Sequence, residues 1–327
     1  MRATVVIPCY RPDANFEKTL ADLNAQTSEE FCVILADDGN QPPLAPRVAK
    51  TLTRPNEIVR FDTNRGIVAG LNACIAAAST PFIVRMDADD RMPPDRIERQ
   101  LSFMDAHPDV DVAGAAMAVF GSGIRVWAKP ADHASIQASL LWGPALNHPT
   151  VVAKTTVMQA HPYPEGFPLA EDYALWLHMA SAGVRMANDS RVAVHYRMEG
   201  QNTSQNGAER RAARYIDMFK HALSVLIGDG PAHTMSSGVD AGCHHVLAGM
   251  PPPPECHPTF QDVESHAHAL RVALAQVHKP WAAQAAQDLQ VRLARAQDKN
   301  RWHKLETVWA LERLRASDWR LLLSSNR

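Results

Sequence analysis

Short apolar runs alternate with amphipathic segments through the first hundred residues of the chain. The apolar runs have the length of β-strands and end at turn residues, which predicts strands at residues 5–7, 31–35, 58–61 and 81–86. Helical spacing or a leading proline pair predicts helices at 15–26, at 66–78 and after Pro93-Pro94. This β-α-β-α order indicates the α/β class, with a mostly parallel sheet flanked by helices.

The rest of the chain divides into two parts. Up to about residue 207 the pattern is mixed, with strands predicted near 111–120 and 148–153, a helix at 170–182 and a last strand ending at 195–197. Beyond it, helices are predicted at 208–227, 262–277, 281–297 and 301–323, and a loop rich in Gly, Pro, Ser and His at 228–260. We therefore expect an α/β domain over residues 1–207 and a helical C-terminal region over 208–327.

Charge and cysteine content narrow the class of protein. The formal net charge of -2 argues against a dedicated nucleic-acid binder, which usually has a basic face. No apolar run approaches the ~18 residues that a membrane-spanning helix needs. The apolar run at the N-terminus is interrupted by Pro8, which argues against a signal peptide. The five cysteines include no CxxC pair and favour a reducing compartment, so we expect a cytoplasmic protein.

Polar residues gather where three of the predicted strands end. These clusters are Pro8-Cys9-Tyr10, Asp37-Asp38 and Asp87-Ala88-Asp89-Asp90. Ligands of open α/β sheets bind beyond the carboxyl ends of the strands. We therefore expect one binding site at this edge of the sheet.

The two acidic clusters each allow two interpretations. Asp87 and Asp89 either hold Mg²⁺ or Mn²⁺, which prefer oxygen ligands and keep open positions for phosphate oxygens, or only cap a solvated loop. Asp37-Asp38 is either an ordinary turn before Gly39 or an acceptor for a donor-rich ligand such as the N3–H of uracil.

Six segments, in order along the chain, carry a family resemblance. They are VVIPCYRP (5–12), LADDGN (35–40), NRGIVAGLN (64–72), VRMDADDRMPPDRIERQLSFM (84–104), NHPTVV (147–152) and AEDYALWLHMASAG (170–183). Over about residues 3–205 this ordered set resembles a family-2 glycosyltransferase with the GT-A fold. The region beyond about 207 resembles no family that we can name.

The resemblance implies an inverting glycosyltransferase. Such an enzyme moves a sugar from a nucleotide diphosphate sugar, with a UDP-sugar favoured, to a hydroxyl of a glycan, lipid-linked or other acceptor in polysaccharide or glycoconjugate biosynthesis. The resemblance also implies a Mg²⁺ or Mn²⁺ cofactor at Asp89 and Asp87, with Asp89 as the direct ligand. It implies that Asp172 is the catalytic base, which takes the acceptor proton as the new bond forms.

The same resemblance implies which residues surround the donor. Pro8 and Tyr10 would line the nucleoside pocket, and Asp38 would accept a hydrogen bond from the base. The other residues at the donor are Asn64, Arg65, Asn72 and Asp87.

Three points stay open at the level of sequence. Asn40 stands where the family usually has serine, and the chain follows the family only loosely after His195-Tyr196-Arg197. The basicity of Asp172 is also open, because a helix N-terminus lowers it while the neighbouring Glu171 and the metal-site acids raise it.

Several histidines and cysteines also allow two interpretations. His148 and His195 either contact phosphate, metal or acceptor or are satisfied by the backbone, and the second is favoured for His148. Cys243-His244-His245 and Cys256-His257 either bind zinc or are solvated, and their spacing favours solvation.

The last predicted helix, at 301–323, is amphipathic and carries Trp302, Trp309 and Trp319 among basic residues. Such a helix either lies on a membrane surface or packs on the catalytic domain or a second subunit. Apolar periodicity reports burial without naming the partner, and packing is favoured.

Three other functions compete at this stage. A phosphohydrolase would use the two aspartates as nucleophile and acid but normally needs a well-placed lysine. A non-catalytic sugar-nucleotide module would not need Asp172, and a dinucleotide oxidoreductase is disfavoured because no GxGxxG follows the first strand.

Overall fold

The chain forms two compact units. The computed structural model describes residues 1–120, 125–197, 208–230, 235, 238–248 and 258–296. The N-terminal unit comprises residues 1–136 and 144–200, and the C-terminal unit comprises residues 137–143 and 201–327. The division near residue 200 lies close to the composition change at 207, and a short segment from the first half of the chain belongs to the second unit.

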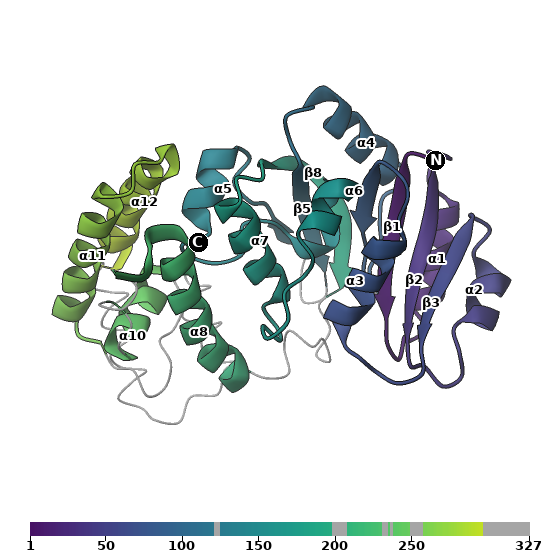
Figure 1. The fold of residues 1–327 in the computed structure, drawn as a ribbon, viewed down its shortest axis with the longest axis horizontal. Coiled ribbons are helices and arrows are strands. Elements are labelled where there is room, and N and C mark those ends of the chain that lie inside the picture. Colours follow the sequence, from purple (N-terminus) through teal and green to yellow (C-terminus); the bar gives the residue numbers. More distant parts are fainter. Residues whose placement is uncertain (121–124, 198–207, 231–234, 236–237, 249–257, 297–327) are drawn as a thin grey trace. The chain divides into compact units, whose positions relative to one another are not determined.

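An eight-stranded sheet is the centre of the N-terminal unit (Figure 1). Its strands are β1 (Ala3–Cys9), β2 (Phe31–Asp38), β3 (Asn56–Phe61), β4 (Phe82–Arg85), β5 (Val112–Phe120), β6 (Arg125–Trp127), β7 (Val152–Lys154) and β8 (Met186–Arg197). Their order is β3-β2-β1-β4-β7-β5-β6, with β8 also beside β5. The β1–β2, β1–β4, β2–β3 and β5–β8 pairs are parallel, and the β4–β7, β5–β7 and β5–β6 pairs are antiparallel. The predicted α/β class with a mostly parallel sheet is confirmed.

Helices pack on both faces of this sheet. Between residues 16 and 181 the chain forms the helices α1 (Phe16–Asn24), α2 (Ala45–Thr51), α3 (Ile67–Ala77), α4 (Arg96–Ala106), α5 (His133–Ser139), α6 (Thr155–Ala160) and α7 (Glu171–Ser181), with a 3-10 turn η1 (His148–Thr150). Residues of α1, α2 and α4 share one core with alternate residues of β1 and β2, such as Val5 and Val33. Helix α3 packs near the opposite set, because a Cβ on Gly70 would lie 3.2 Å from Ala36 Cβ.

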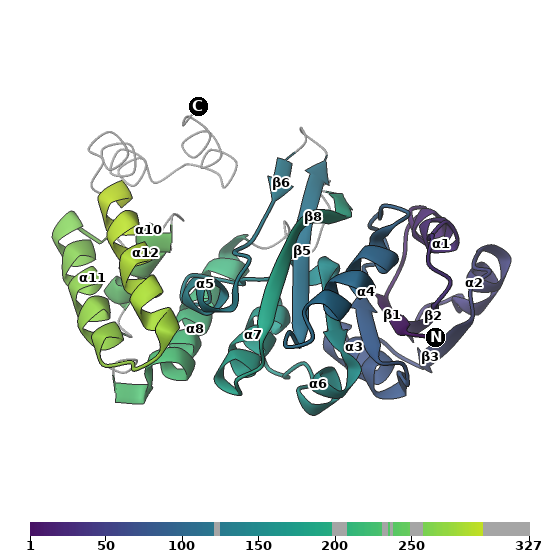
Figure 2. The ribbon, with the colours of Figure 1, turned by 90° about the horizontal axis from the view of Figure 1, so that it is seen from above.

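Strands β5 and β6 form a hairpin, and β8 runs along the other side of β5 (Figure 2). Trp127 of β6 and Tyr196 of β8 stack across it with ring centroids 6.5 Å apart. The predicted strand at 148–153 is shorter than expected, because residues 148–150 form η1 and β7 begins at Val152.

Within the described residues, the C-terminal unit contains the helices α8 (Ala208–Ile227), α10 (Gly238–Ala248), α11 (Phe260–Ala275) and α12 (Pro280–Ala296). The prediction of a loop over 228–260 is wrong for the residues of α10, which form a helix. That segment is helical although it is rich in Gly and His, because packing buries Cys243, His244 and His245. Helix α11 begins with a capping box between Thr259 and Asp262.

The predicted helix at 301–323, with its tryptophans, lies outside the described residues. Within the described ranges, no helix is both long enough and apolar enough to span a bilayer.

Candidate active site

Strand β4 delivers the acidic cluster to the edge of the sheet. Asp87 and Asp89 are half-buried, and Asp90 is 1% exposed. Arg85 lies two residues before Asp87 and is 4% exposed, and its Nη1 donates to Asp87 Oδ2 at 2.6 Å. Asp87 lies just beyond the end of β4, and this bond turns its carboxylate toward the buried cation.

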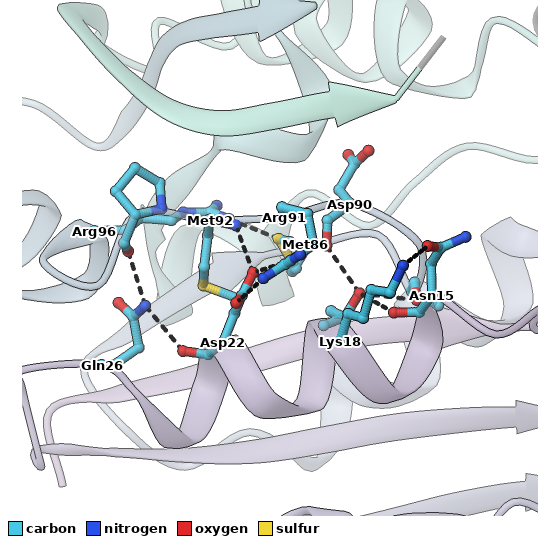
Figure 3. Close-up of polar contacts among 12 residues, drawn as sticks. Asn15, Lys18, Asp22, Gln26, Met86, Asp90, Arg91, Met92 and Arg96 are labelled. Atoms are coloured by element: carbon cyan, nitrogen blue, oxygen red, sulfur yellow. Dashed lines mark hydrogen bonds and ion pairs between the residues drawn. The ribbon is translucent and has the colours of Figure 1, made fainter. Parts of the chain in front are cut away.

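The loop that carries these aspartates is held by α1 (Figure 3). Thr19 Oγ1 donates to the carbonyl oxygens of Ala88 and Asp90 at 3.1 and 2.8 Å. Arg91 forms a two-point ion pair with Asp22, at 2.6 and 2.7 Å. These contacts fix the backbone of the acidic cluster on the α1 side.

Strand β8 holds the same loop through the backbone. Arg91 and His195 exchange backbone hydrogen bonds of 3.2 and 2.8 Å, while the His195 side chain is exposed. The acidic loop is therefore braced from two elements that are distant in sequence.

The end of β2 lies beside the end of β1. Asp37 is 1% exposed and accepts hydrogen bonds from the backbone of Leu44 and Asn40 and from Arg60. Burial opposes its ionisation, but these donors together hold its pKa below the usual value. Asp37 is thus a structural anchor for the turn.

Asn40, at the position where serine is usual, joins the two strand ends. Its Nδ2 donates to Cys9 O at 2.9 Å, and its Oδ1 accepts from Arg11 N at 2.6 Å. Pro8 is half-buried, and Tyr10 is 45% exposed with the Arg11 guanidinium 5.0 Å from its ring centroid.

Asp38 organises the turn before α3. Its Oδ1 accepts from Arg65 N at 2.6 Å, and its Oδ2 accepts from Asn64 Nδ2 at 2.7 Å and Gly66 N at 2.9 Å. A carboxylate offers about four acceptor positions, so these three bonds leave capacity for one further donor. The Arg65 guanidinium lies 4.7 Å from the Phe61 ring centroid.

The three predicted strand ends meet. Strand β1 pairs in parallel with both β2 and β4, and Cys9 at the end of β1 is the pairing partner of Asp37. Asn72 is placed differently, because its side-chain amide binds the backbone of Tyr163 through Nδ2···O at 3.0 Å and N···Oδ1 at 2.9 Å.

Tyr163 also connects the site to η1. Its hydroxyl lies 2.7 Å from Nε2 of His148, whose ring makes an edge contact with Trp176 of α7 at 6.3 Å. Burial and the charge of Arg85 hold the pKa of His148 well below its usual value, so the imidazole is neutral. His148 is therefore satisfied within the protein, by a side-chain hydroxyl.

Helix α7 presents Glu171 and Asp172 in its first turn and is deeply buried beyond it, with Leu175, Trp176 and Met179 at 0% exposure. Asp172 is half-buried and its Oδ1 accepts from Tyr173 N at 2.8 Å. The carboxylate thus satisfies one free N–H group of the first turn.

Burial has the largest effect on the pKa of Asp172. Burial raises the pKa of Asp172, while the Tyr173 N–H and the charges of Arg85 and Lys129 lower it, and the net shift is upward. The pKa of Glu171 is raised by burial and by the charge of Asp172. Asp172 is therefore a stronger base than an ordinary aspartate.

The chemistry of the donor set fits a hard divalent cation. In the described ranges no group of three or more His, Cys, Asp or Glu side chains is arranged as a metal site. Mg²⁺ commonly takes only one or two carboxylates and fills its other positions with substrate phosphates and water. Asp87 and Asp89 match that requirement. Cys256-His257 of the suggested zinc site lie outside the described residues.

Three residues of the site were not predicted from the sequence, namely Arg85, Lys129 and Tyr163. Only Arg85 carries a sign of its role in the sequence. It is a charged residue in the apolar run of a buried strand, where an unpaired charge is costly, so a partner is expected nearby. Tyr163 and Lys129 carry no such signal, because each reaches the site through a loop.

Comparison with known proteins identifies the family. Residues 4–150 match the model described as glycosyl transferase family 2. The chain is 32% identical over 195 residues to the amylovoran biosynthesis glycosyltransferase AmsE of Erwinia amylovora, covering 57% of this chain and 72% of AmsE. The chain belongs to glycosyl transferase family 2. This glycosyltransferase is also 25% identical over 232 residues to the O-antigen biosynthesis glycosyltransferase WbnJ of Escherichia coli, covering 68% of the chain and 88% of WbnJ.

Solved structures confirm the fold of this glycosyltransferase. TarS 1–349 of S. aureus matches with a TM-score of 0.55 and 16% identity, over 93% of this chain and 92% of TarS 1–349. The mannosyltransferase PcManGT of Pyrobaculum calidifontis, in complex with GDP-Man and Mn2+, matches with a TM-score of 0.55 and 18% identity, over 95% and 85% of the two chains. The predicted GT-A type of sheet with C-terminal helices is confirmed at the level of fold.

Proposed function

We propose that this glycosyltransferase moves a sugar, with inversion, from a nucleotide diphosphate sugar to an acceptor hydroxyl. The observation that carries this proposal is the electrostatic contrast at one sheet edge. Asp87 is paired with a buried arginine, whereas Asp172 is a carboxylate of raised pKa at the start of a buried helix. Two carboxylates in such different environments suit two roles, donor binding and proton abstraction.

The donor lies along the ends of β1, β2 and β4. Pro8 and Tyr10 line the nucleoside pocket, and Asp38 uses its remaining acceptor position for the base. Asn64 and Arg65 are presented by the turn that Asp38 organises. Asn72, which the resemblance places at the donor, instead spends its side-chain amide on the backbone of Tyr163 and would border the donor only through its place on α3. The uracil N3–H suits the remaining acceptor of Asp38, which is why we favour a UDP-sugar.

Asp89 and Asp87 would hold Mg²⁺ or Mn²⁺, with Asp89 as the direct ligand. A divalent cation at this place supplies charge neutralisation for the diphosphate leaving group. Mn2+ accompanies GDP-Man in the PcManGT complex, which supports a metal of this type. The protein contributes a fixed loop, since Thr19, Asp22 and His195 bond to its backbone.

Asp172 is the catalytic base and takes the proton of the acceptor hydroxyl. Its raised pKa brings it closer to that of an efficient base at neutral pH, and help of this kind is typically worth about 10²–10⁴-fold in rate. The names of AmsE and WbnJ support a role in polysaccharide biosynthesis and therefore a glycan or lipid-linked acceptor.

We further propose that residues 208–327 act in acceptor choice, assembly or peripheral membrane contact, and not in donor chemistry. A cytoplasmic location fits a nucleotide-sugar donor. The domain division that we use is 1–207 for donor chemistry and 208–327 for the helical region.

One assay tests the proposed activity. The purified chain with Mn²⁺ is offered a panel of nucleotide sugars, and release of nucleoside diphosphate and of inorganic phosphate is measured in parallel. Slow release of nucleoside diphosphate that stops with excess chelator supports the proposal. Release of inorganic phosphate identifies a phosphohydrolase, and neither product with intact donor binding identifies a non-catalytic module.

A further inference from the structure

Leu169 has a backbone conformation that leucine rarely adopts. Its φ is +66°, in the left-handed region, and it directly precedes Ala170, the N-cap of α7. Bulky side chains are outliers there, because Cβ comes too close to the following carbonyl oxygen. Among the described residues the other left-handed positions are Arg11 and glycines, two of which, Gly166 and Gly183, lie close to α7 in the sequence. Near α7, Leu169 therefore stands where the chain otherwise uses glycine.

A tight turn imposes this conformation. Ala170 N donates to Phe167 O at 3.0 Å, which closes a four-residue turn with Pro168 second and Leu169 third. Proline at the second place with a positive φ at the third is the type II pattern, in which the third residue is normally glycine or asparagine. Ala170 O then accepts from Ala174 N at 3.0 Å and begins α7. The turn thus holds Leu169 at a fixed place directly before the helix.

Contacts within the protein account poorly for a leucine in this turn. Leu169 is 43% exposed, so much of its apolar surface is uncovered. Arg11 differs, because its backbone N–H donates to Asn40 Oδ1 at 2.6 Å and its guanidinium lies 5.0 Å from the Tyr10 ring centroid. Glycine would form the same turn without strain. Strained residues gather at functional sites, so the leucine side chain is expected to act on something outside the core.

The position of Leu169 indicates what its side chain meets. Three residues span at most about 11 Å, so Leu169 lies near Asp172, the proposed base. A base comes within about 2.6–3.2 Å of the hydroxyl whose proton it takes. The group that carries this hydroxyl therefore lies near the turn. In a glycan or lipid-linked glycan that group is a sugar ring, and its C–H groups form an apolar face that an aliphatic side chain can contact.

We propose that Leu169 is an acceptor-binding residue that packs against the C–H face of the acceptor sugar ring and helps to select the acceptor. The inference rests on the proposed function, in which Asp172 takes the acceptor proton. Because the turn already fixes the backbone, little conformational freedom is lost when the side chain binds, and the contact is preorganised.

The experiment separates the side chain of Leu169 from its backbone conformation. The full chain with Mn²⁺ and the nucleotide sugar that it hydrolyses fastest is offered methyl and octyl glycosides of glucose, galactose, mannose and N-acetylglucosamine. The initial rate of nucleoside diphosphate release gives the KM of each glycoside. Leu169→Ala and Leu169→Gly should both raise the KM of the best glycoside about tenfold, the scale of losing an apolar contact. Leu169→Met keeps an apolar side chain of similar volume and should restore a KM close to wild type.

The melting temperature should follow a different order from the KM. Leu169→Gly should melt about 2–4 °C above Leu169→Ala, because glycine relieves the left-handed strain that alanine keeps. Val157→Ala is the matched control, since it shortens a half-buried apolar side chain of α6, which follows β7 at the opposite edge of the sheet from the site. It should leave the glycoside KM at the wild-type value.

Several results overturn the inference. One is a wild-type KM in Leu169→Ala, and another is a KM that changes in step with melting temperature across the variants, which would show a purely structural role. A KM increase confined to octyl glycosides identifies a lipid chain as the occupant, and an altered oligomeric state by light scattering with unchanged KM identifies a second copy. No acceleration by any glycoside excludes the sugar ring. Failure of the proposed function differs, because the wild-type protein then releases no nucleoside diphosphate from any nucleotide sugar.

Discussion

The side-chain amide of Asn72 forms two hydrogen bonds with the backbone of Tyr163. Its Nδ2 donates to Tyr163 O at 3.0 Å, and its Oδ1 accepts from Tyr163 N at 2.9 Å. The two residues are 91 positions apart. Through this pair, α3 on the donor side holds the segment that leads to α7. This amide group is therefore one of the contacts that join α3 to the segment before α7.

Asn72→Ala should destabilise the protein by about 1–3 kcal/mol, because two partly buried backbone groups lose their partner. The measurement is the free energy of unfolding in urea. Asn72→Asp is the informative second variant, since it keeps the acceptor for Tyr163 N but replaces the donor to Tyr163 O with a negatively charged oxygen. A wild-type free energy of unfolding in Asn72→Ala would contradict a bracing role.

Gly39 is a second point where two chain segments meet. It has a φ of +74°, and a Cβ would lie 2.5 Å from the backbone carbon of Thr63. Gly39→Ala should therefore lower both stability and UDP affinity, because the turns that carry Asp38 and Asn64 must move apart.

Gly166→Ala is the matched control for this prediction. Its φ is +88°, but no atom lies within 4 Å of the added Cβ, so it pays only the left-handed backbone cost of roughly 1–2 kcal/mol. Thermal melting and UDP calorimetry compare the two variants. Equal losses in both would show that backbone conformation alone matters at Gly39.

The sequence predicts well where the strands at one edge of the sheet end, for a physical reason. Apolar runs that stop at Pro8, Asp37 and Asp87 mark strand ends, and parallel strands bring such ends together. The prediction fails where contacts between residues far apart in the sequence determine the local structure. Helix α10 is rich in Gly and His and forms because its residues are buried in the C-terminal unit.

The site residues also divide into those that a local sequence pattern reveals and those that only tertiary contacts reveal. The acidic clusters carry their signal locally, through spacing and turn chemistry. The role of Arg85 is not predicted, because the sequence of a short apolar strand does not show whether the arginine side chain points toward Asp87 or away from it. Contacts such as Tyr163 to His148 join segments by tertiary structure, which local periodicity does not report.

Asp89→Ala should abolish transfer while leaving the fold intact, because it removes the proposed direct metal ligand at an already braced loop. Calorimetry of Mn²⁺ with UDP should show loss of the metal-dependent part of UDP binding. Glu29→Gln is the control, since Glu29 is exposed and precedes β2 at the opposite edge of the sheet. Full activity of Asp89→Ala, or of the wild-type protein in excess chelator, would contradict the proposed metal site.

Asp172→Asn should lose transfer by about a hundredfold or more while binding donor and Mn²⁺ normally. Asparagine keeps an oxygen for Tyr173 N–H, so the helix start is preserved, but it takes no proton. The initial rate of nucleoside diphosphate release is the measurement, with Glu171→Gln as the matched neighbour. If Glu171→Gln is inactive and Asp172→Asn turns over normally, the base is Glu171.

The raised pKa of Asp172 adds a pH dependence with a definite sign. An acid whose folded-state pKa is raised favours the folded state fully below its unfolded pKa, and this contribution is lost as the pH rises through the folded pKa. Asp172→Asn has no such carboxylate to ionise in a buried place. Its melting temperature relative to wild type should therefore increase from about pH 4 toward neutrality, while wild-type turnover should fall as acid protonates Asp172. A melting difference that is flat with pH would mean that Asp172 ionises as an ordinary aspartate, and the base would then depend on position alone.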